Sequence, residues 1–133
     1  MRAILDTSVV LAAAVPALPE DLAISAATLA ELHFGVLATA EASTRAERLR
    51  RLAVLERSFA ALPVDERVAR SYGRLAAAVV QVGRQPRARV MDLLIAATAH
   101  AYDAKLYTAN AADLRGLEDL VEIVDIATIE SGA

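Results

Sequence analysis

The chain has 133 residues, a formal charge of −3 at pH 7 and 56% apolar residues, which is typical of one globular domain and not of a disordered chain. The absence of cysteine excludes disulfides, thiolate catalysis and a cysteine-based zinc site. The net charge argues against indiscriminate nucleic-acid binding over the whole surface. No basic region precedes a long apolar run and no apolar stretch is as long as a membrane span, so we expect a soluble cytoplasmic protein.

The first patterned segment is a short apolar run, Ala3-Ile4-Leu5, which predicts a buried strand. Asp6 stands at its C-terminal end, and Thr7 or Ser8 is expected to cap a helix over residues 9–15. The carboxyl ends of strands are where open α/β sheets bind their ligands. Asp6 is therefore a candidate site residue.

The middle of the chain alternates between strand and helix patterns. We expect a strand at 22–24, a helix capped by Ser25 and reaching residue 40, a charged helix over 41–60, an edge strand at 62–64 and a helix over 65–82 ended by Gly83. The helix after Ser25 should pack through Leu29, Leu32, Val36 and Leu37.

The C-terminal third continues this alternation. A basic loop at 84–89 precedes a helix over 91–102, a strand at 105–107 ending at Thr108, a helical turn capped by Asn110 and a last strand at 121–124. Strands that alternate with helices predict an α/β fold with a parallel sheet covered on both faces.

Carboxylates recur near the predicted strand ends. Asp6 follows the first strand, and Asp113 follows the strand that ends at Thr108, so both are expected at one edge of the sheet. Asp92 opens a helix, and a helix entrance can lie at either edge. A cluster of carboxylates without cysteine or paired histidine favours a hard cation.

Each acid also has a structural interpretation. Asp6 can cap the first helix, Asp92 can cap its own helix or interact with the helix dipole, and Asp113 can help to cap a turn with Asn110. Glu31 lies opposite the apolar face on a helical wheel, which describes an ordinary exposed acid as well as a residue facing a cleft.

Arginines form two clusters, at residues 45–51 and at Arg84, Arg87 and Arg89. The planar guanidinium binds phosphate, so local phosphate contacts are possible on an acidic protein, while solvated surface positions are the alternative.

Four segments in order carry a family resemblance: Ile4-Leu5-Asp6-Thr7-Ser8, Thr28-Leu29-Ala30-Glu31-Leu32, residues 92–99 and residues 106–114. Together they resemble PIN-domain ribonucleases, and specifically the VapC-type toxins of bacterial toxin–antitoxin pairs. Leu114 and Asp103 depart from the residues that the family often has there, and neither is a presumed ligand. The resemblance covers essentially the whole chain.

The resemblance implies a three-layer α/β/α domain spanning residues 1–133, with a small, mainly parallel central sheet. It implies that Asp6 and Asp92 are the principal Mg²⁺ or Mn²⁺ ligands and that Glu31 and Asp113 complete the acidic pocket. Ser8, Thr108 and Asn110 would be supporting polar groups, and Arg84, Arg87 and Arg89 would contact the RNA backbone.

The implied activity is metal-dependent hydrolysis of RNA phosphodiester bonds. The implied partners are the RNA substrate, a cognate antitoxin that blocks the site, and a second copy in a homodimer, a heterotetramer or a larger assembly. The Leu-rich face of residues 49–59 and the helix over 65–82 are candidate surfaces for these protein partners. The alternatives are a non-catalytic PIN-like protein-binding module and a flavodoxin-like signalling domain, and the second lacks the acidic pair that it would need near Asp6.

Overall fold

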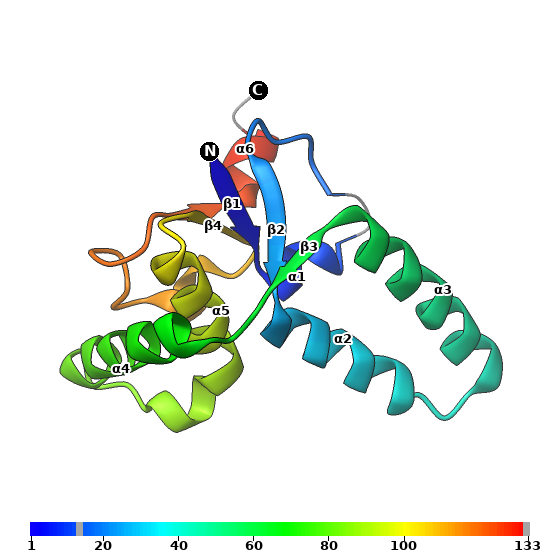
Figure 1. Ribbon diagram of the computed structural model, residues 1–133, viewed down its shortest axis with the longest axis horizontal. Helices are drawn as coiled ribbons and strands as arrows, with labels where there is room; N and C mark the ends of the chain where they lie inside the picture. Colours follow the sequence, from blue (N-terminus) through cyan, green and yellow to red (C-terminus); the bar gives the residue numbers. More distant parts are fainter. Residues whose placement is uncertain (13–14, 132–133) are drawn as a thin grey trace.

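The computed structural model describes residues 1–12 and 15–131 and is built around a five-stranded sheet. Its strands are β1 (Arg2–Leu5), β2 (Asp21–Ser25), β3 (Ala60–Leu62), β4 (Lys105–Thr108) and β5 (Ile123–Asp125), and all neighbours pair in parallel. The spatial order is β3-β2-β1-β4-β5. The chain first builds the sheet from β1 towards β3 and then from β4 towards β5, so the direction reverses between β1 and β4 (Figure 1).

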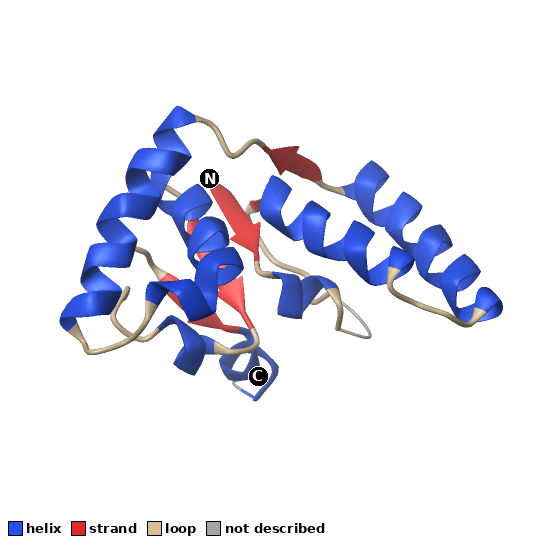
Figure 2. Cartoon of the chain, turned by 90° about the horizontal axis from the view of Figure 1, so that it is seen from below, coloured by secondary structure: helices blue, strands red, loops and turns tan. Residues whose placement is uncertain are grey.

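Helices cover both faces of this sheet. They are α1 (Thr7–Val10), α2 (Ala26–Leu37), α3 (Ala42–Ser58), α4 (Glu66–Gln81), α5 (Val90–Ala101) and α6 (Ile126–Ser131), with short 3₁₀ helices η1 (Pro86–Arg89) and η2 (Ala111–Leu114). Helices α4 and α5 pack together on one face, while α1, α3 and α6 contribute to the core on the other. Helices α2 and α3 lie side by side and project from the sheet as an arm (Figures 1 and 2). The predicted three-layer α/β/α fold is confirmed.

Two apolar clusters flank the sheet because side chains alternate along each strand. On β1, Ile4 enters the cluster under α4 and α5, whereas Ala3 and Leu5 enter the cluster under α1 and α3. On β4, Leu106 and Tyr107 divide in the same way. Strands buried on both faces read as continuous apolar runs, which is why the sequence pattern identified β1.

The predicted start of the first helix is wrong. Asp6, not Thr7 or Ser8, is its N-cap, with an extended backbone at φ −65° and ψ 154°. The helix spans Thr7–Val10 rather than residues 9–15, and residues 13 and 14 of the predicted span lie outside the described residues. Asp6 therefore has the structural task that was expected of its hydroxyl neighbours.

Other boundaries shift by a few residues. Helix α2 ends at Leu37 instead of residue 40, and Leu37 is 77% exposed, so its predicted place on the packed face is wrong. The edge strand is Ala60–Leu62 rather than 62–64, because Pro63 has no N–H for the ladder. The last strand is Ile123–Asp125 instead of 121–124, and α6 follows it without having been predicted.

The predicted Ser25 cap is confirmed, whereas Asp65, predicted as the first residue of its helix, is the N-cap of α4. Ser25 Oγ accepts a hydrogen bond from the Ala27 amide at 3.1 Å, and Asp65 Oδ1 accepts one from the Val68 amide at 3.1 Å. Gly83 follows α4 with φ +79°, a conformation that favours glycine. Within residues 1–12 and 15–131, none of the helices has the length and apolar character required to span a bilayer.

Candidate functional site

The candidate site lies at the C-terminal edge of the sheet, where the strand order reverses between β1 and β4. Asp6 follows β1 directly, is only 8% exposed, and its amide donates to the Tyr107 carbonyl at 2.9 Å. Its Oδ2 accepts hydrogen bonds from Ser8 Oγ at 2.5 Å and from Thr108 Oγ1 at 3.1 Å. This carboxylate is therefore held in one orientation by residues from two neighbouring strand ends.

The same hydroxyls also fix the backbone after β4. Ser8 Oγ accepts from the Ala109 amide at 3.0 Å, and Thr108 Oγ1 accepts from the Asn110 amide at 3.0 Å. The side chain of Asn110 makes no capping hydrogen bond to η2, although Asn110 stands at its N-cap position. Ser8 and Thr108 thus support Asp6 through their side chains, and Asn110 is tied to the site through its backbone.

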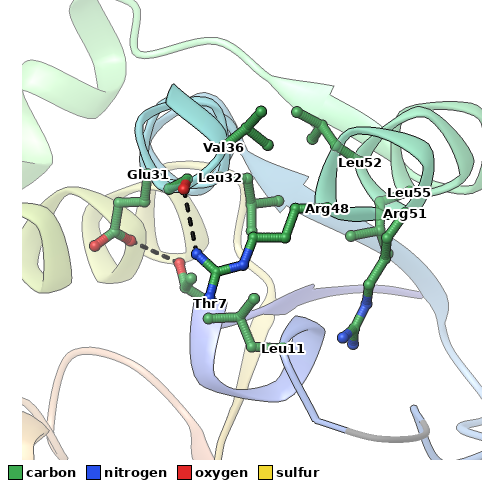
Figure 3. A pocket seen from close by; sticks show the side chains of 10 residues that line it. Thr7, Leu11, Glu31, Leu32, Val36, Arg48, Arg51, Leu52 and Leu55 are labelled. Carbon is green, nitrogen blue, oxygen red and sulfur yellow. Dashed lines mark hydrogen bonds between the residues drawn. The ribbon is translucent and has the colours of Figure 1, made fainter. Parts of the chain in front are cut away.

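Glu31 reaches the site from α2. Its Oε1 accepts a hydrogen bond from Thr7 Oγ1 at 2.7 Å, and Thr7 Oγ1 also lies 3.0 Å from Thr28 Oγ1 (Figure 3). Because Thr7 directly follows Asp6, this contact brings Glu31 close to the end of β1. Glu31 is half-buried, so it faces the cleft rather than being an ordinary solvated acid.

Asp92 and Asp113 come from the opposite face. Asp92 lies in the first turn of α5, and Asp113 lies in η2 after β4. The pKa of Asp92 is raised above its usual value, first by burial and then by the negative charges of Asp6, Glu31 and Asp113, while Arg89 opposes the shift. The structure thus brings Asp6, Glu31 and Asp113 into electrostatic range of Asp92.

The three predicted RNA-binding arginines have different surroundings. Arg89 Nη1 lies 3.3 Å from Asp113 Oδ1 and 3.9 Å from Asp92 Oδ2. Arg84 instead donates to three carbonyl oxygens of the η2 segment, at 3.1–3.4 Å. Arg87 is exposed and has no hydrogen-bond or ion-pair partner within the described part of the chain. These three side chains are therefore not equally available to a ligand.

Two hollows meet at Glu31. An open hollow of about 380 Å³ lies between Glu31 and residues 87–92, and includes Arg87, Arg89 and Asp92 in its wall. A groove of about 450 Å³ runs between α1, α2 and α3 (Figure 3). Its apolar lining consists of Leu11, Leu32, Val36, Leu52 and Leu55.

The acidic groups of the site have the chemistry of a divalent-cation site. No three His, Cys, Asp or Glu side chains within residues 1–12 and 15–131 are arranged so that they could hold a metal ion as they stand. The donor chemistry nevertheless fits, because the site offers only oxygen ligands and negative charge destabilises the ionised form of Asp92. A guanidinium, that of Arg89, already stands beside two of these carboxylates. The side chains present match a hard cation in charge and ligand type.

Two hydroxyl residues of this edge were not predicted as site residues. Thr7 holds Glu31, and Thr28 is fully buried one helical turn before Glu31. The available signal was the recurrence of threonine beside two candidate acids, in Asp6-Thr7 and in Thr28-Leu29-Ala30-Glu31. Spacing alone does not show that these two segments meet.

Comparison with known proteins gives concordant matches. A family model for the PIN domain matches residues 3–120. Ribonuclease VapC8 of Mycobacterium tuberculosis is 40% identical over 100 residues, which cover 72% of this chain and 88% of that protein.

Solved structures agree with these matches. A crystal structure of VapBC-5, a toxin–antitoxin system of Mycobacterium tuberculosis, superposes with a TM-score of 0.78 at 38% identity and covers 93% of this chain and 98% of the other. VapBC-1 of nontypeable Haemophilus influenzae shares the fold, with a TM-score of 0.76 at 24% identity, and the match covers 96% of this chain and 99% of that one.

Proposed function

The chain belongs to the PIN-domain family, and we propose that it is a metal-dependent endoribonuclease toxin that acts in the cytoplasm and is restrained by a cognate antitoxin. The relatives named above are a ribonuclease and members of VapBC toxin–antitoxin pairs. The observation that carries the proposal is the meeting of Asp6, Glu31, Asp92 and Asp113 where the strand order reverses.

In this proposal Asp6 and Asp92 hold Mg²⁺ or Mn²⁺, and Glu31 and Asp113 complete the acidic pocket. The bound cation supplies a water activated for attack and neutralises the developing charge on the phosphate. Ser8 and Thr108 hold Asp6 Oδ2, which keeps this carboxylate pointed in one direction. Side chains that bind a metal are commonly held in one orientation by hydrogen bonds from neighbouring residues.

Glu31 is the candidate for orienting water. Thr7 holds its Oε1, and no other described side chain hydrogen-bonds to the Glu31 carboxylate, so Oε2 can accept a proton or a hydrogen bond from a water molecule. The open hollow beside Glu31 and Asp92 gives a phosphate access to this edge. Metal-assisted hydrolysis of a phosphodiester is the reaction that best fits this set of groups.

The RNA backbone would approach over residues 87–92. Arg87 is the arginine best placed for a phosphate contact, because it is exposed and lines the open hollow. Such contacts add affinity without reading sequence. We assign Arg84 a structural task instead, because its guanidinium is already engaged by the backbone of η2.

The antitoxin would occupy the apolar groove between α1, α2 and α3. Leu52 and Leu55 from the predicted Leu-rich face line this groove, and Glu31 lines its other side (Figure 3). An apolar helix or strand seated there would obstruct the carboxylates without touching the core on the other side of the sheet. Helix α4, which buries one face against α5, has an outer face for a homodimer or a larger assembly with antitoxin.

A non-catalytic binding module is the second candidate, because no three acids are positioned for a metal in the described residues. The test is cleavage of a panel of structured and single-stranded RNAs by the purified protein with Mg²⁺, Mn²⁺ or EDTA, beside Asp6→Asn. Asparagine also caps helices well, so this variant keeps the α1 cap and removes the charge. Metal-dependent cleavage that Asp6→Asn abolishes supports the nuclease. Cleavage that survives this substitution refutes the assignment, and absence of metal binding favours the binding module.

A further inference from the structure

Arg89 occupies an unusual position at the edge of the acidic pocket. It is the last residue of η1, and its side chain is 29% exposed. One nitrogen, Nη1, approaches Asp113 Oδ1 at 3.3 Å, the Asp113 carbonyl at 3.3 Å and Asp92 Oδ2 at 3.9 Å. A single guanidinium thus lies against two carboxylates that come from different elements.

An ordinary surface ion pair does not account for this placement. The i,i+3 spacing from Arg89 to Asp92 explains one contact, and such exposed pairs contribute little to stability. The shorter contact reaches η2, twenty-four residues along the chain, and Arg89 also lines the hollow that contains Glu31 and Asp92. Arg89 therefore stands against two carboxylates of the pocket and lines the same hollow as a third, Glu31.

Neighbouring arginines show that this arrangement is specific. Arg84 reaches the same η2 segment but contacts only its carbonyl oxygens, and Arg87 makes no such contact within the described residues. Only a change at Arg89 removes a cation from the carboxylates themselves. Arg87 thus offers a matched control of equal charge, whereas Arg84 also holds the backbone of η2.

We propose that Arg89 is an internal counter-cation of the pocket, which competes with the divalent ion for Asp92 and Asp113 and thereby sets metal affinity. This inference rests on the proposed function, because it assumes that the pocket binds a metal. Asp113 Oδ1 and Asp92 Oδ2 face the guanidinium and are less available to a divalent ion. Metal binding therefore competes with these two contacts, and the cost of weakening them lowers the metal affinity.

The test is a calorimetric titration of the purified protein with Mn²⁺, without RNA, for the wild type and for Arg89→Gln. We expect Arg89→Gln to bind Mn²⁺ about three- to tenfold more tightly, which is the scale of losing one partly screened charge contact. Arg89→Lys keeps the charge and should stay close to the wild type. Arg87→Gln removes the same charge without touching a carboxylate and should change the affinity less than about twofold.

The sign of the change separates the proposal from a positioning role. If Arg89 instead holds Asp92 and Asp113 ready for the metal, Arg89→Gln binds Mn²⁺ more weakly, and the proposal is overturned. Unchanged affinity overturns it as well. If the wild type binds no Mn²⁺, both the proposed function and this inference fail. If the wild type binds Mn²⁺ but Arg89→Gln does not bind it more tightly, only this inference fails. Thermal melting confirms folding, and Arg89→Met replaces Arg89→Gln if that variant does not fold.

Discussion

Negative charge is paired in different ways at the two ends of the sheet. At the N-terminal end, Glu20 is 6% exposed at its side chain and has a cationic and a phenolic partner: Lys105 Nζ at 2.9 Å from Oε2 and Tyr107 Oη at 2.7 Å from Oε1. At the C-terminal end, two carboxylates, those of Asp92 and Asp113, share one partly exposed guanidinium, that of Arg89.

The pKa values follow this difference. The hydrogen bond from Lys105, and then that from Tyr107, lowers the pKa of Glu20, and Glu20 in turn raises the pKa of Lys105. The pKa of Asp92 is raised instead, by burial and by its acidic neighbours. A carboxylate thus stabilises the fold where a cation and a hydroxyl pair it. Where other carboxylates surround it, it favours the binding of a further cation. Substitutions at the two ends should therefore separate stability from activity.

Asp92→Asn should give the largest effect. We expect cleavage to fall about a hundredfold or more, because a principal metal ligand is lost. The metal-free stability should change by less than about 1 kcal/mol, since relief of repulsion offsets the lost interaction with the α5 dipole. Saturating Mn²⁺ should raise the melting temperature of the wild type and leave that of Asp92→Asn unchanged. Equal stabilisation of both by Mn²⁺ would remove Asp92 from the ligand set.

Glu20→Gln should have the reverse profile. The free energy of unfolding should fall by about 1–2 kcal/mol, because Lys105 loses its closest partner and keeps only Glu122 at 3.7 Å. Cleavage by the folded protein should stay within twofold of wild type, because Glu20 lies at the opposite end of the sheet from the acidic pocket. Urea denaturation and initial rates measure the two quantities. Tyr107→Phe, which removes only the hydroxyl that donates to Glu20, is the milder control.

The Glu20 contribution should also depend on pH. Because the folded-state pKa of Glu20 lies below its ordinary value of 4.5, its stabilisation is present above that pH and is lost as the pH falls through the folded value. Lys105, whose pKa is raised above 10.5, loses its stabilisation only as the pH rises through its folded value. The stability difference between wild type and Glu20→Gln should thus be flat near neutral pH and shrink in acid. A difference that grows in acid would contradict the pairing.

This contrast also shows what the sequence can predict. Asp6 and Asp113 were placed at one edge because strand order and parallel pairing suffice for that. The position of Glu31 could not be predicted in this way, because a helical wheel shows a face of α2 but not whether that face is turned towards the cleft. The hydrogen bond from Thr7 shows that Glu31 is turned towards the end of β1.

Contacts between segments far apart in the chain could not be predicted from the sequence pattern. Glu20 stands between the predicted helix over 9–15 and the predicted strand at 22–24, and its partners on β4 lie 85 and 87 residues away. Arg84, Arg87 and Arg89 form one basic cluster in the sequence. In the structure, the short helix η1 separates them, so that their side chains have three different sets of neighbours. Local propensity contains no information about either outcome.

Arg87→Gln, which changes the C-terminal edge of the sheet, should give the smallest effect. We expect a modestly weaker affinity for RNA and a salt dependence whose logarithmic slope falls by about one unit or slightly less, as for one lost phosphate contact. Arg84→Gln should leave that slope unchanged and loosen η2 instead, because its guanidinium serves backbone carbonyls. Fluorescence anisotropy with a short labelled RNA at several salt concentrations, in EDTA to prevent cleavage, measures both variants. A reduced slope for Arg84→Gln with none for Arg87→Gln would reverse the assignment and place the RNA over η2 instead of η1.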